Sequence, residues 1–522
     1  MKYTLITALL ALGISGVAHA KTLTWSFQGD AQSLDPYVLN ETFTLGFLGN
    51  VYEGLIRRTP DLEIEPGLAE RWEILEPTRW RFYLREGVKF HNGNDFTADD
   101  VVFSANRVRA DGSDLKTRIG DDVKVVKVDD YTVDFITPQP NPILHSEWSN
   151  WYIMDKEWAE ENDAVAPSSV TEGKESFAAF NANGTGPFVV TKRETDVETV
   201  LQPNPDWWDE PEHNLTEVVF KPISSDPTRV AALLSGSIDM AYPIPVQDLN
   251  RVDRNDGTTA LTGPELRTIF LGMNQVSDEL PSSNIKGENP LKDVRVREAM
   301  YRAIDIQAIK QKVMRNLADP TALMISPKLV DSSAHLKRLE LDVARATELM
   351  AEAGYPDGFS LTMDCPNNRY VNDEKICTAV VGMLAKIGIK VDLLAQPKAL
   401  YFAKVLGPKY DTDFYLLGWT PGSFDSWNVL HNLIRCRDDG GAGKFNLGGY
   451  CNPKIGELTD QILSETDIEK RDAMIAEAYR IMHEDRGYIP LHQQGLAWGK
   501  QDNVDLEQRA DNVFDLRYVT VQ

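Results

Sequence analysis

Positive charge is what this 522-residue sequence lacks most: 54 lysines and arginines stand against 79 aspartates and glutamates, for a net charge of -25. Proteins that bind nucleic acids or anionic lipid surfaces use clustered Lys and Arg to neutralise phosphates. The composition therefore argues against both kinds of partner. Wholesale disorder is excluded as well, because 42% of the residues are hydrophobic and aromatic residues occur along the whole length. At about 150 residues per domain, the length indicates two to four folding units.

Cysteine is scarce, and no two cysteines have the C-x-x-C spacing of zinc ribbons and thioredoxin-like sites. The four are Cys365, Cys377, Cys436 and Cys451. Three pairings are possible, and in an oxidising compartment we expect Cys365–Cys377 and Cys436–Cys451, because each closes a short, polar loop. Each bridge would then contribute roughly 3 kcal/mol in the chain-entropy description. Free thiols are the alternative.

The common catalytic and metal-binding motifs are also missing. There is no H-E-x-x-H and no G-x-S-x-G, and the histidines are scattered singly, without metal-ligand spacing. Gly440–Lys444 resembles a phosphate-binding loop, but it lacks the upstream Gly and a Ser or Thr after the Lys. We therefore expect a loop enclosed by a disulfide there. The absence of these motifs lowers the prior for an enzyme and does not exclude one. The prediction is a protein that is not an enzyme, with no catalytic residue, no cofactor and no metal site.

One long apolar run is present, at the N-terminus. Thr4–Val17 follows a single Lys and leads into Ala18-His19-Ala20, the pattern of a secretory signal peptide. The run is too short to span a bilayer comfortably, since a spanning helix needs about 20 residues. We expect a signal peptide over residues 1–20, cleavage after Ala20, and an exported, periplasmic product without a lipid anchor, since no Cys lies near the cut. A buried N-terminal helix is the alternative.

Helix and strand signals alternate along the chain, which indicates a mixed α/β architecture. Thr97 and Asp100 have the spacing of a helix-starting capping box. In the second half a predicted helix over Asn372–Ile387 ends at a glycine and returns as a strand over Ile389–Leu394. Thr466-Asp-Ile-Glu469 predicts a capping box for a helix that runs to about Glu484.

No stretch of the sequence has the Pro and Gly density of a linker. We therefore expect the chain to pass from one lobe to the other within ordered segments. The best crossing points are near Leu271–Asn274 and Tyr488–Leu491. A lobe bounded by these two segments would be inserted into the other.

Several motifs together resemble one family, the dipeptide/oligopeptide-type (family 5) solute-binding proteins of bacterial ABC importers. The resemblance extends from about residue 23 to residue 495. Its motifs are Pro66–Trp72, Trp80–His91, Phe96–Ser104, Asn50–Leu55, Gly184–Phe188, Asp293–Met300, Leu349–Phe359 and Gly418-Trp419. Each motif alone is weak, and their combination is specific.

The resemblance implies an α/β fold, a two-lobed periplasmic-binding-protein clamp with an additional β-rich subdomain in lobe one. Lobe one would comprise residues 21–274 plus 490–522, with the extra subdomain at about 66–185. Lobe two would comprise residues 275–489. A ligand would sit in the crevice between the lobes and be buried when they close.

A peptide ligand places a physical demand on such a crevice, because a peptide is a zwitterion. Burying an unpaired ion costs several kcal/mol, whereas a micromolar ligand gains only about 8 kcal/mol in all. The site therefore needs one fixed cation and one fixed anion.

Three residues fall where the family has ligand contacts. The resemblance assigns Arg369 to the ligand carboxylate, Asp425 to the ligand ammonium and Trp419 to the wall of a side-chain subsite. The alternatives are a solvated loop arginine, an N-cap for the helix that begins near Trp427, and a core tryptophan. Gly422 stands where the oligopeptide branch has its ammonium-binding Asp, which leaves the kind of ligand open.

The predicted function is a periplasmic receptor that delivers a short peptide or peptide-like solute to an ABC permease in the inner membrane. We expect a monomer that binds a small molecule and no nucleic acid. The alternatives among binding proteins are receptors for an oligosaccharide, an opine or a metal chelate. An exported hydrolase is the alternative among enzymes. A sensory or chaperone role stays open.

Overall fold

A computed structural model describes residues 21–168, 176–330, 333, 335–407 and 409–522, apart from the side chain of Glu147. The predicted signal peptide, residues 1–20, lies outside the described residues. No helix in these ranges is long and apolar enough to cross a membrane.

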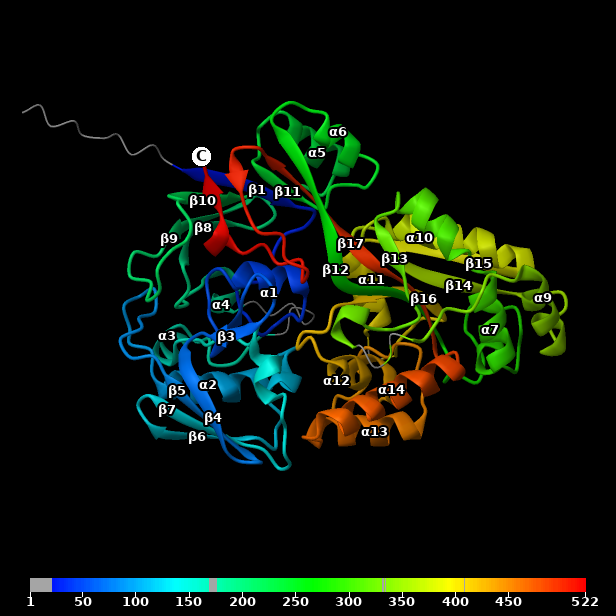
Figure 1. The fold of residues 1–522 in the computed structure, drawn as a ribbon, viewed down its shortest axis with the longest axis horizontal. Helices are drawn as coiled ribbons and strands as arrows, with labels where there is room; N and C mark the ends of the chain where they lie inside the picture. The colour runs from blue at the N-terminus through cyan, green and yellow to red at the C-terminus, as the bar shows by residue number, and fades with distance from the viewer. Residues whose placement is uncertain (1–20, 169–175, 331–332, 334, 408) are drawn as a thin grey trace, which may run out of the picture.

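Two lobes lie side by side and are joined by two long antiparallel strands, β12 (Thr258–Met273) and β17 (Tyr488–Gln501) (Figure 1). An 11-stranded mixed sheet continues from one lobe into the other through this pair, in the order β15-β14-β16-β12-β17-β11-β1-β10-β9-β8, with β13 paired to β17. β12 is buried from Glu265 to its end and β17 over all but its last two residues, so the two strands form a shared core between the lobes.

Lobe one is built on the part of the large sheet that contains β1, the first described strand. Its strands are β1 (Thr22–Phe27), β8 (Phe188–Glu194), β9 (Glu198–Pro203), β10 (Glu217–Phe220) and β11 (Met240–Tyr242). The helices α1 (Thr42–Leu48), α5 (Asp226–Leu234) and α6 (Leu249–Asp253) accompany them, and short pairs form from β2 (Ile56–Arg58) with β3 (Ile64–Pro66) and from β18 (Val504–Asp505) with β19 (Thr520–Val521). An aromatic core around Trp25, Phe43 and Phe220 holds this sheet and α1 together.

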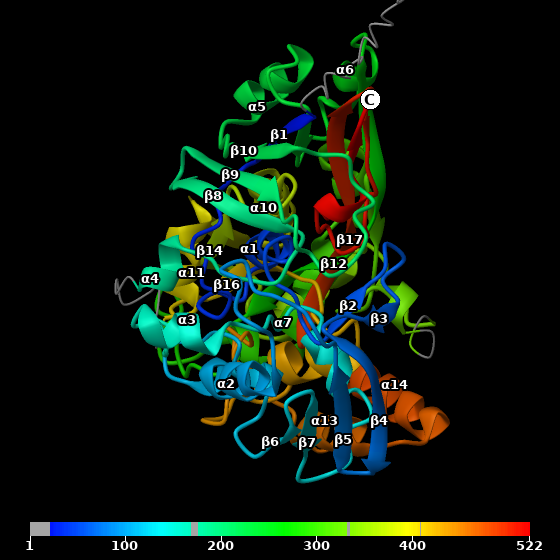
Figure 2. The same ribbon diagram turned by 90° about the vertical axis from the view of Figure 1, so that its left-hand side faces the viewer.

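A separate four-stranded antiparallel sheet extends lobe one at the end away from α5 and α6 (Figure 2). Its strand order is β4 (Ala69–Glu76), β5 (Arg79–Leu84), β7 (Thr132–Ile136) and β6 (Lys124–Asp129). The helices α2 (Ala98–Arg109), α3 (Lys156–Glu161) and α4 (Phe177–Phe180) belong to the same region. Buried rings of Trp80, Phe82, Phe135 and Trp148 fill its interior. This is the β-rich addition that the resemblance implied.

Lobe two consists of the other half of the large sheet and the helices around it. Its strands are β13 (Ala318–Pro320), β14 (Phe359–Pro366), β15 (Ile389–Gln396) and β16 (Phe414–Trp419). Its helices are α7 (Val294–Ala303), α8 (Ile306–Ala308), α9 (Val343–Glu352), α10 (Asp373–Leu384), α11 (Lys398–Val405), α12 (Ser426–Val429), α13 (Pro453–Ser464) and α14 (Ile468–Glu484). β14 runs parallel to both β15 and β16, as expected when helices connect the strands.

Local sequence signals predict the start of α2 correctly and the start of α14 to within one residue. The capping box of Thr97 and Asp100 is present at the start of α2. The N-cap predicted for α14 is off by one residue, because Asp467 and not Thr466 is the N-cap. The Asp467 carboxylate accepts a hydrogen bond from the backbone N–H of Lys470. An Asp caps as well as a Thr does, and here it lies directly before the first helical residue.

The two predicted disulfides are confirmed. Cys365 pairs with Cys377 and Cys436 with Cys451, and no cysteine among the described residues is free. Each bridge closes a short loop of lobe two, with sequence separations of 12 and 15 residues.

The crossings predicted near Leu271–Asn274 and Tyr488–Leu491 stay predictions. The register of β12 against β17 shifts between Ile269 and Phe270 and, earlier in β12, between Pro264 and Thr268. The buried residues Glu265 and Arg267 occupy this irregularity, opposite Gln494. We propose that the lobes divide at this point, since a strand bends most easily where its ladder is interrupted.

Gly184, in the turn Gly184–Phe188, offers a test of this packing. A Cβ at Gly184 would lie 2.1 Å from the carbonyl oxygen of Val51, and a backbone atom cannot move aside as a flexible side chain can. We expect Gly184→Ala to lower the free energy of unfolding by about 1–3 kcal/mol, measured by urea unfolding.

Gly456→Ala in α13 is the matched control. A Cβ there meets no atom within 4 Å, and Ala is favoured over Gly within a helix by about 1 kcal/mol. This variant should be neutral or more stable. Equal stability of the Gly184→Ala variant and the unmodified chain would contradict the packing argument.

Candidate ligand-binding cavity

A cavity of about 970 Å³ lies between the two lobes. Lobe one contributes Glu41, Asp114 and Arg118 to its wall, β12 contributes Arg267, and lobe two contributes further residues from four segments. The lobe-two residues in the wall include Arg369, Lys398, Trp419, Phe424, Asn428, Lys444 and Phe445. The volume suits a ligand of drug size or of a few amino acids, because binding cavities for small molecules span about 300–1,000 Å³.

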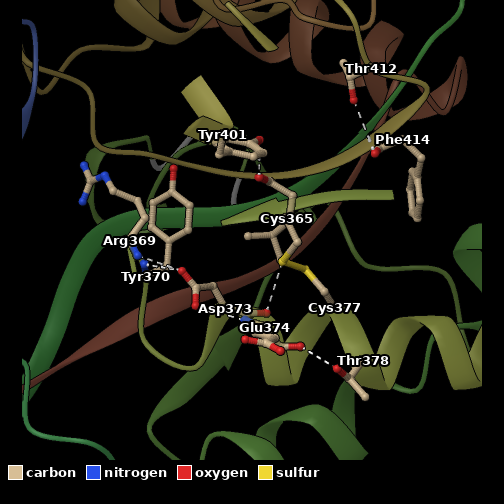
Figure 3. Close-up of a disulfide and its surroundings, with 11 residues drawn as sticks. Cys365, Arg369, Tyr370, Asp373, Glu374, Cys377, Thr378, Tyr401, Thr412 and Phe414 are labelled. Carbon is tan, nitrogen blue, oxygen red and sulfur yellow. Dashed lines mark hydrogen bonds between the residues drawn. A yellow bond between two sulfur atoms is a disulfide. The ribbon is translucent and has the colours of Figure 1, made fainter. Parts of the chain in front are cut away.

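The loop that carries Arg369 is held rigidly at both ends. The Asp373 carboxylate accepts hydrogen bonds from the backbone N–H groups of Arg369 (2.8 Å) and Tyr370 (2.9 Å). The Cys365–Cys377 disulfide ties the end of β14 to α10 directly beneath the loop. Figure 3 shows the Arg369 guanidinium extending away from this disulfide. The predicted cation therefore faces the cavity from a well-supported backbone.

Glu41 of lobe one is the anion that faces Arg369. It is the N-cap of α1, and its Oε2 accepts from the backbone N–H of Thr44 at 2.9 Å. Its Oε1 lies 3.4 Å from Arg369 Nη2 across the cavity. Burial by itself would raise the pKa of Glu41, but Lys398, Arg369 and the Thr44 hydrogen bonds outweigh burial and lower the pKa to about 2. Glu41 is therefore ionised at neutral pH.

Lys398, the first residue of α11, adds a second cation beside Arg369. Burial lowers the pKa of Lys398, an effect that nearby Glu41 opposes and nearby Arg369 reinforces. Two cations of lobe two thus lie near one carboxylate of lobe one, and Arg369 is the one at ion-pair distance. Arg369, which the sequence predicted as a ligand contact, lines the cavity, and the sequence analysis predicted neither Glu41 nor Lys398 beside it.

A buried polar cluster lies where β12 and β17 cross between the lobes. Arg267 Nε donates to Glu265 at 2.8 Å, and Gln494 Nε2 donates to the other Glu265 oxygen at 2.5 Å. Gln494 in turn accepts from the backbone N–H of Val371, one residue beyond Tyr370. This chain of bonds connects the interlobe strands to the loop that carries Arg369.

Trp419 lies in the cavity wall at the end of β16, as the resemblance implied for a subsite residue. Its indole N–H donates to Asn428 at 3.0 Å, and its ring lies 4.7 Å from the Phe445 ring, centroid to centroid. The two rings form an aromatic surface. Whether a ligand side chain packs there stays a prediction.

Asp425 is placed differently from the predicted ammonium ligand. It does not belong to the cavity lining, and both of its oxygens pair with Arg471 of α14, at 2.7 and 2.9 Å. Its Oδ1 also caps α12 by accepting from the N–H of Trp427 at 2.7 Å. The helix-capping alternative thus describes the observed contacts of Asp425, and the proposed site does not include this residue.

Two arginines of lobe one contact the loop that precedes Asp425. A Cβ at Gly422 would lie 2.8 Å from Arg118 Nη2, so the glycine makes room for this guanidinium. The Arg58 guanidinium lies 4.2 Å from the centroid of the Phe424 ring and donates to the Ser423 carbonyl at 3.2 Å. Side chains from one lobe therefore seat against the backbone of the other.

Two further contacts bridge the lobes. Lys444 Nζ lies 3.1 Å from Asp114 Oδ1, and Gln28 donates to the Arg369 carbonyl at 3.4 Å. Lys444 and Phe445 belong to the loop enclosed by Cys436 and Cys451. The glycine-rich stretch predicted as a disulfide-enclosed loop therefore leads into residues of the cavity wall.

Comparisons with known proteins agree with this architecture. The solved structure of the periplasmic binding protein DppA from Helicobacter pylori, in complex with the peptide STSA, superposes with a TM-score of 0.84 at 23% identity, covering 96% of this chain and 98% of that one. The structure of AgaA from A. tumefaciens R10 in complex with agropinic acid gives 0.83 at 22% identity, with coverages of 96% and 99%. The glutathione-binding protein GsiB of Shigella dysenteriae is 24% identical over 513 residues, which are 96% of this chain and 94% of that protein.

The fold is therefore that of the two-lobed periplasmic binding proteins, with a ligand-sized cavity between the lobes. Residues 63–441 match the profile of the bacterial extracellular solute-binding proteins, family 5. The chain belongs to this family, and both the predicted family and the predicted fold class are confirmed.

The contacts of Asp425 generate a stability test. Asp425→Ala removes both a helix cap and one partner of a largely buried ion pair, so we expect the free energy of unfolding to fall by about 1–3 kcal/mol. Arg471→Met should destabilise the protein similarly, and urea unfolding of the double variant should show a loss smaller than the sum of the two. Strictly additive losses would mean that the observed ion pair contributes nothing.

Proposed function

We propose that this chain is a non-catalytic periplasmic receptor that captures a short peptide or peptide-like solute between its lobes and delivers it to an ABC permease. The observation that carries the proposal is the cavity of about 970 Å³ enclosed between two lobes in a family 5 solute-binding protein. A monomer suffices for this function, because the described residues of one chain complete the cavity wall.

The composition of the cavity wall supports a peptide-like ligand. Arg369 offers a charge-assisted donor for a carboxylate, and Trp419 with Phe445 offers apolar surface for a side chain. The relatives named above bind the peptide STSA, glutathione and agropinic acid, all compounds that carry carboxylates. A neutral oligosaccharide has no carboxylate and so would not pair with Arg369 and Lys398.

Export is part of the same proposal. The N-terminal pattern that ends at Ala18-His19-Ala20 would direct the chain across the inner membrane and be removed after Ala20. The two confirmed disulfides agree with an oxidising compartment.

Arg369→Met tests the assignment of the cavity. Native mass spectrometry of the freshly purified mature protein should reveal a bound small molecule, and isothermal titration calorimetry with that compound should show at least a tenfold loss of affinity for Arg369→Met. If nothing co-purifies, a library of dipeptides and tripeptides provides the probes. Asp425→Asn keeps a capping side chain outside the cavity and should bind within threefold of the unmodified protein.

Two results would contradict the proposal. One is unchanged affinity in Arg369→Met together with a large loss in Asp425→Asn, which would move the site. The other is the appearance of new fragments when the protein is incubated with a peptide pool, which would restore the exported hydrolase.

A further inference from the structure

The cavity has a charge opposite to that of the chain. Among the described residues that line it, nine are basic and five are acidic, whereas the whole sequence carries a net charge of -25. The basic residues are Arg57, Arg58, Arg118, Arg267, Arg369, Lys398, Lys444, Arg509 and Arg517, and the acidic ones are Glu41, Glu53, Asp114, Asp511 and Asp515.

Four of the five carboxyl groups already have close partners. Asp511 and Asp515 pair with Arg509 at 2.8 and 3.0 Å, and Asp114 pairs with Lys444 at 3.1 Å. Glu53 accepts from Thr185 at 2.9 Å and from the indole N–H groups of the tryptophans at 207 and 208 at 3.2 and 2.9 Å. An incoming ammonium group would have to displace these partners, or else compete with Arg369 for Glu41.

Two cations of lobe two, Lys398 and Arg369, have fewer close partners than these carboxyl groups have. No described residue provides a hydrogen-bond acceptor or an ion-pair partner for Lys398 Nζ, although it is half-buried in the cavity wall. Arg369 pairs with Glu41 alone, and its buried Nε has no hydrogen-bond acceptor among the described residues. A half-buried charge is costly unless it is paired, so an anionic group placed between Lys398 and Arg369 would be stabilised by both.

We propose that the cavity selects a peptide-like ligand with more carboxylates than ammonium groups, and that Lys398 and Arg369 together hold a carboxylate that a zwitterionic peptide without acidic side chains lacks. The inference rests on the proposed function and narrows it, because it names the charge class of the solute. Lys398 is then a binding residue that determines specificity, and Arg369 is its partner. A ligand ammonium contributes little, because the carboxylates around it are already satisfied.

Matched dipeptides separate charge from size. Gln-Gln is a zwitterion without net charge at neutral pH, Glu-Glu has nearly the same shape with two added negative charges, and N-acetyl-Glu-Glu lacks the ammonium. By calorimetry at low ionic strength we expect Glu-Glu to bind at least tenfold more tightly than Gln-Gln. N-acetylation of Glu-Glu should change the affinity less than threefold.

Lys398→Met removes one charge while keeping a long side chain. In this variant we expect the affinity for Glu-Glu to fall at least tenfold and that for Gln-Gln less than threefold. Lys386→Met, at an exposed position of the same lobe outside the cavity lining, makes the same change in net charge and should leave both affinities within twofold. Thermal unfolding of both variants checks that the fold is retained.

The possible failures are distinguishable. If no peptide or co-purifying compound binds, the proposed function fails and the charge preference fails with it. If Gln-Gln binds as tightly as Glu-Glu, or if N-acetylation abolishes binding, the receptor function stands and the preference for acidic ligands is wrong. If Lys398→Met and Lys386→Met lost the same affinity for Glu-Glu, the loss would come from the change in net charge, and Lys398 would not be part of the site.

Discussion

The pairing of β12 with β17 carries the chain from one lobe to the other, and the rest of the molecule is arranged around that pair. An uninterrupted ladder would make the connection stiff, but the register shifts between Pro264 and Thr268. The buried group of Glu265, Arg267 and Gln494 satisfies the polar atoms at this irregularity. The same group reaches the loop of Arg369 through Val371, so the interlobe connection and the cavity wall are parts of one hydrogen-bonded structure.

Both disulfides support cavity residues of lobe two. One brackets the loop of Arg369, and the other brackets the loop of Lys444 and Phe445. Loops pay a large entropic penalty when a ligand must order them, and a loop that is already held pays less. Together with the Asp373 hydrogen bonds, the bridges keep polar groups near the positions that a ligand needs.

An excess of basic side chains in the cavity lining is compatible with a net charge of -25 for the whole chain, because exposed charges elsewhere are screened. Exposed charges farther apart than about 8 Å are largely screened at physiological salt, so the net charge of the chain says little about an enclosed site. Charges in the cavity wall interact in a less polar surrounding and are felt more strongly. The value of about 2 to which the pKa of Glu41 falls is one consequence, since two neighbouring cations outweigh the effect of its burial.

The α/β class, the disulfide pairing and the starts of α2 and α10 could be predicted from the sequence, because they depend on local spacing: hydrophobic periodicity, capping residues and short loops between cysteines. The family could be predicted because several short motifs together resemble it. Arg369 and Trp419 lie in such motifs, and both line the cavity. Only the tertiary structure decided which charges meet. Asp425 lies a few residues from the cavity wall yet pairs with Arg471, 46 residues away, while Glu41 faces Arg369 from the other lobe. Such pairings depend on how two lobes and two crossing strands bring distant segments together, and no local pattern in the sequence records that arrangement.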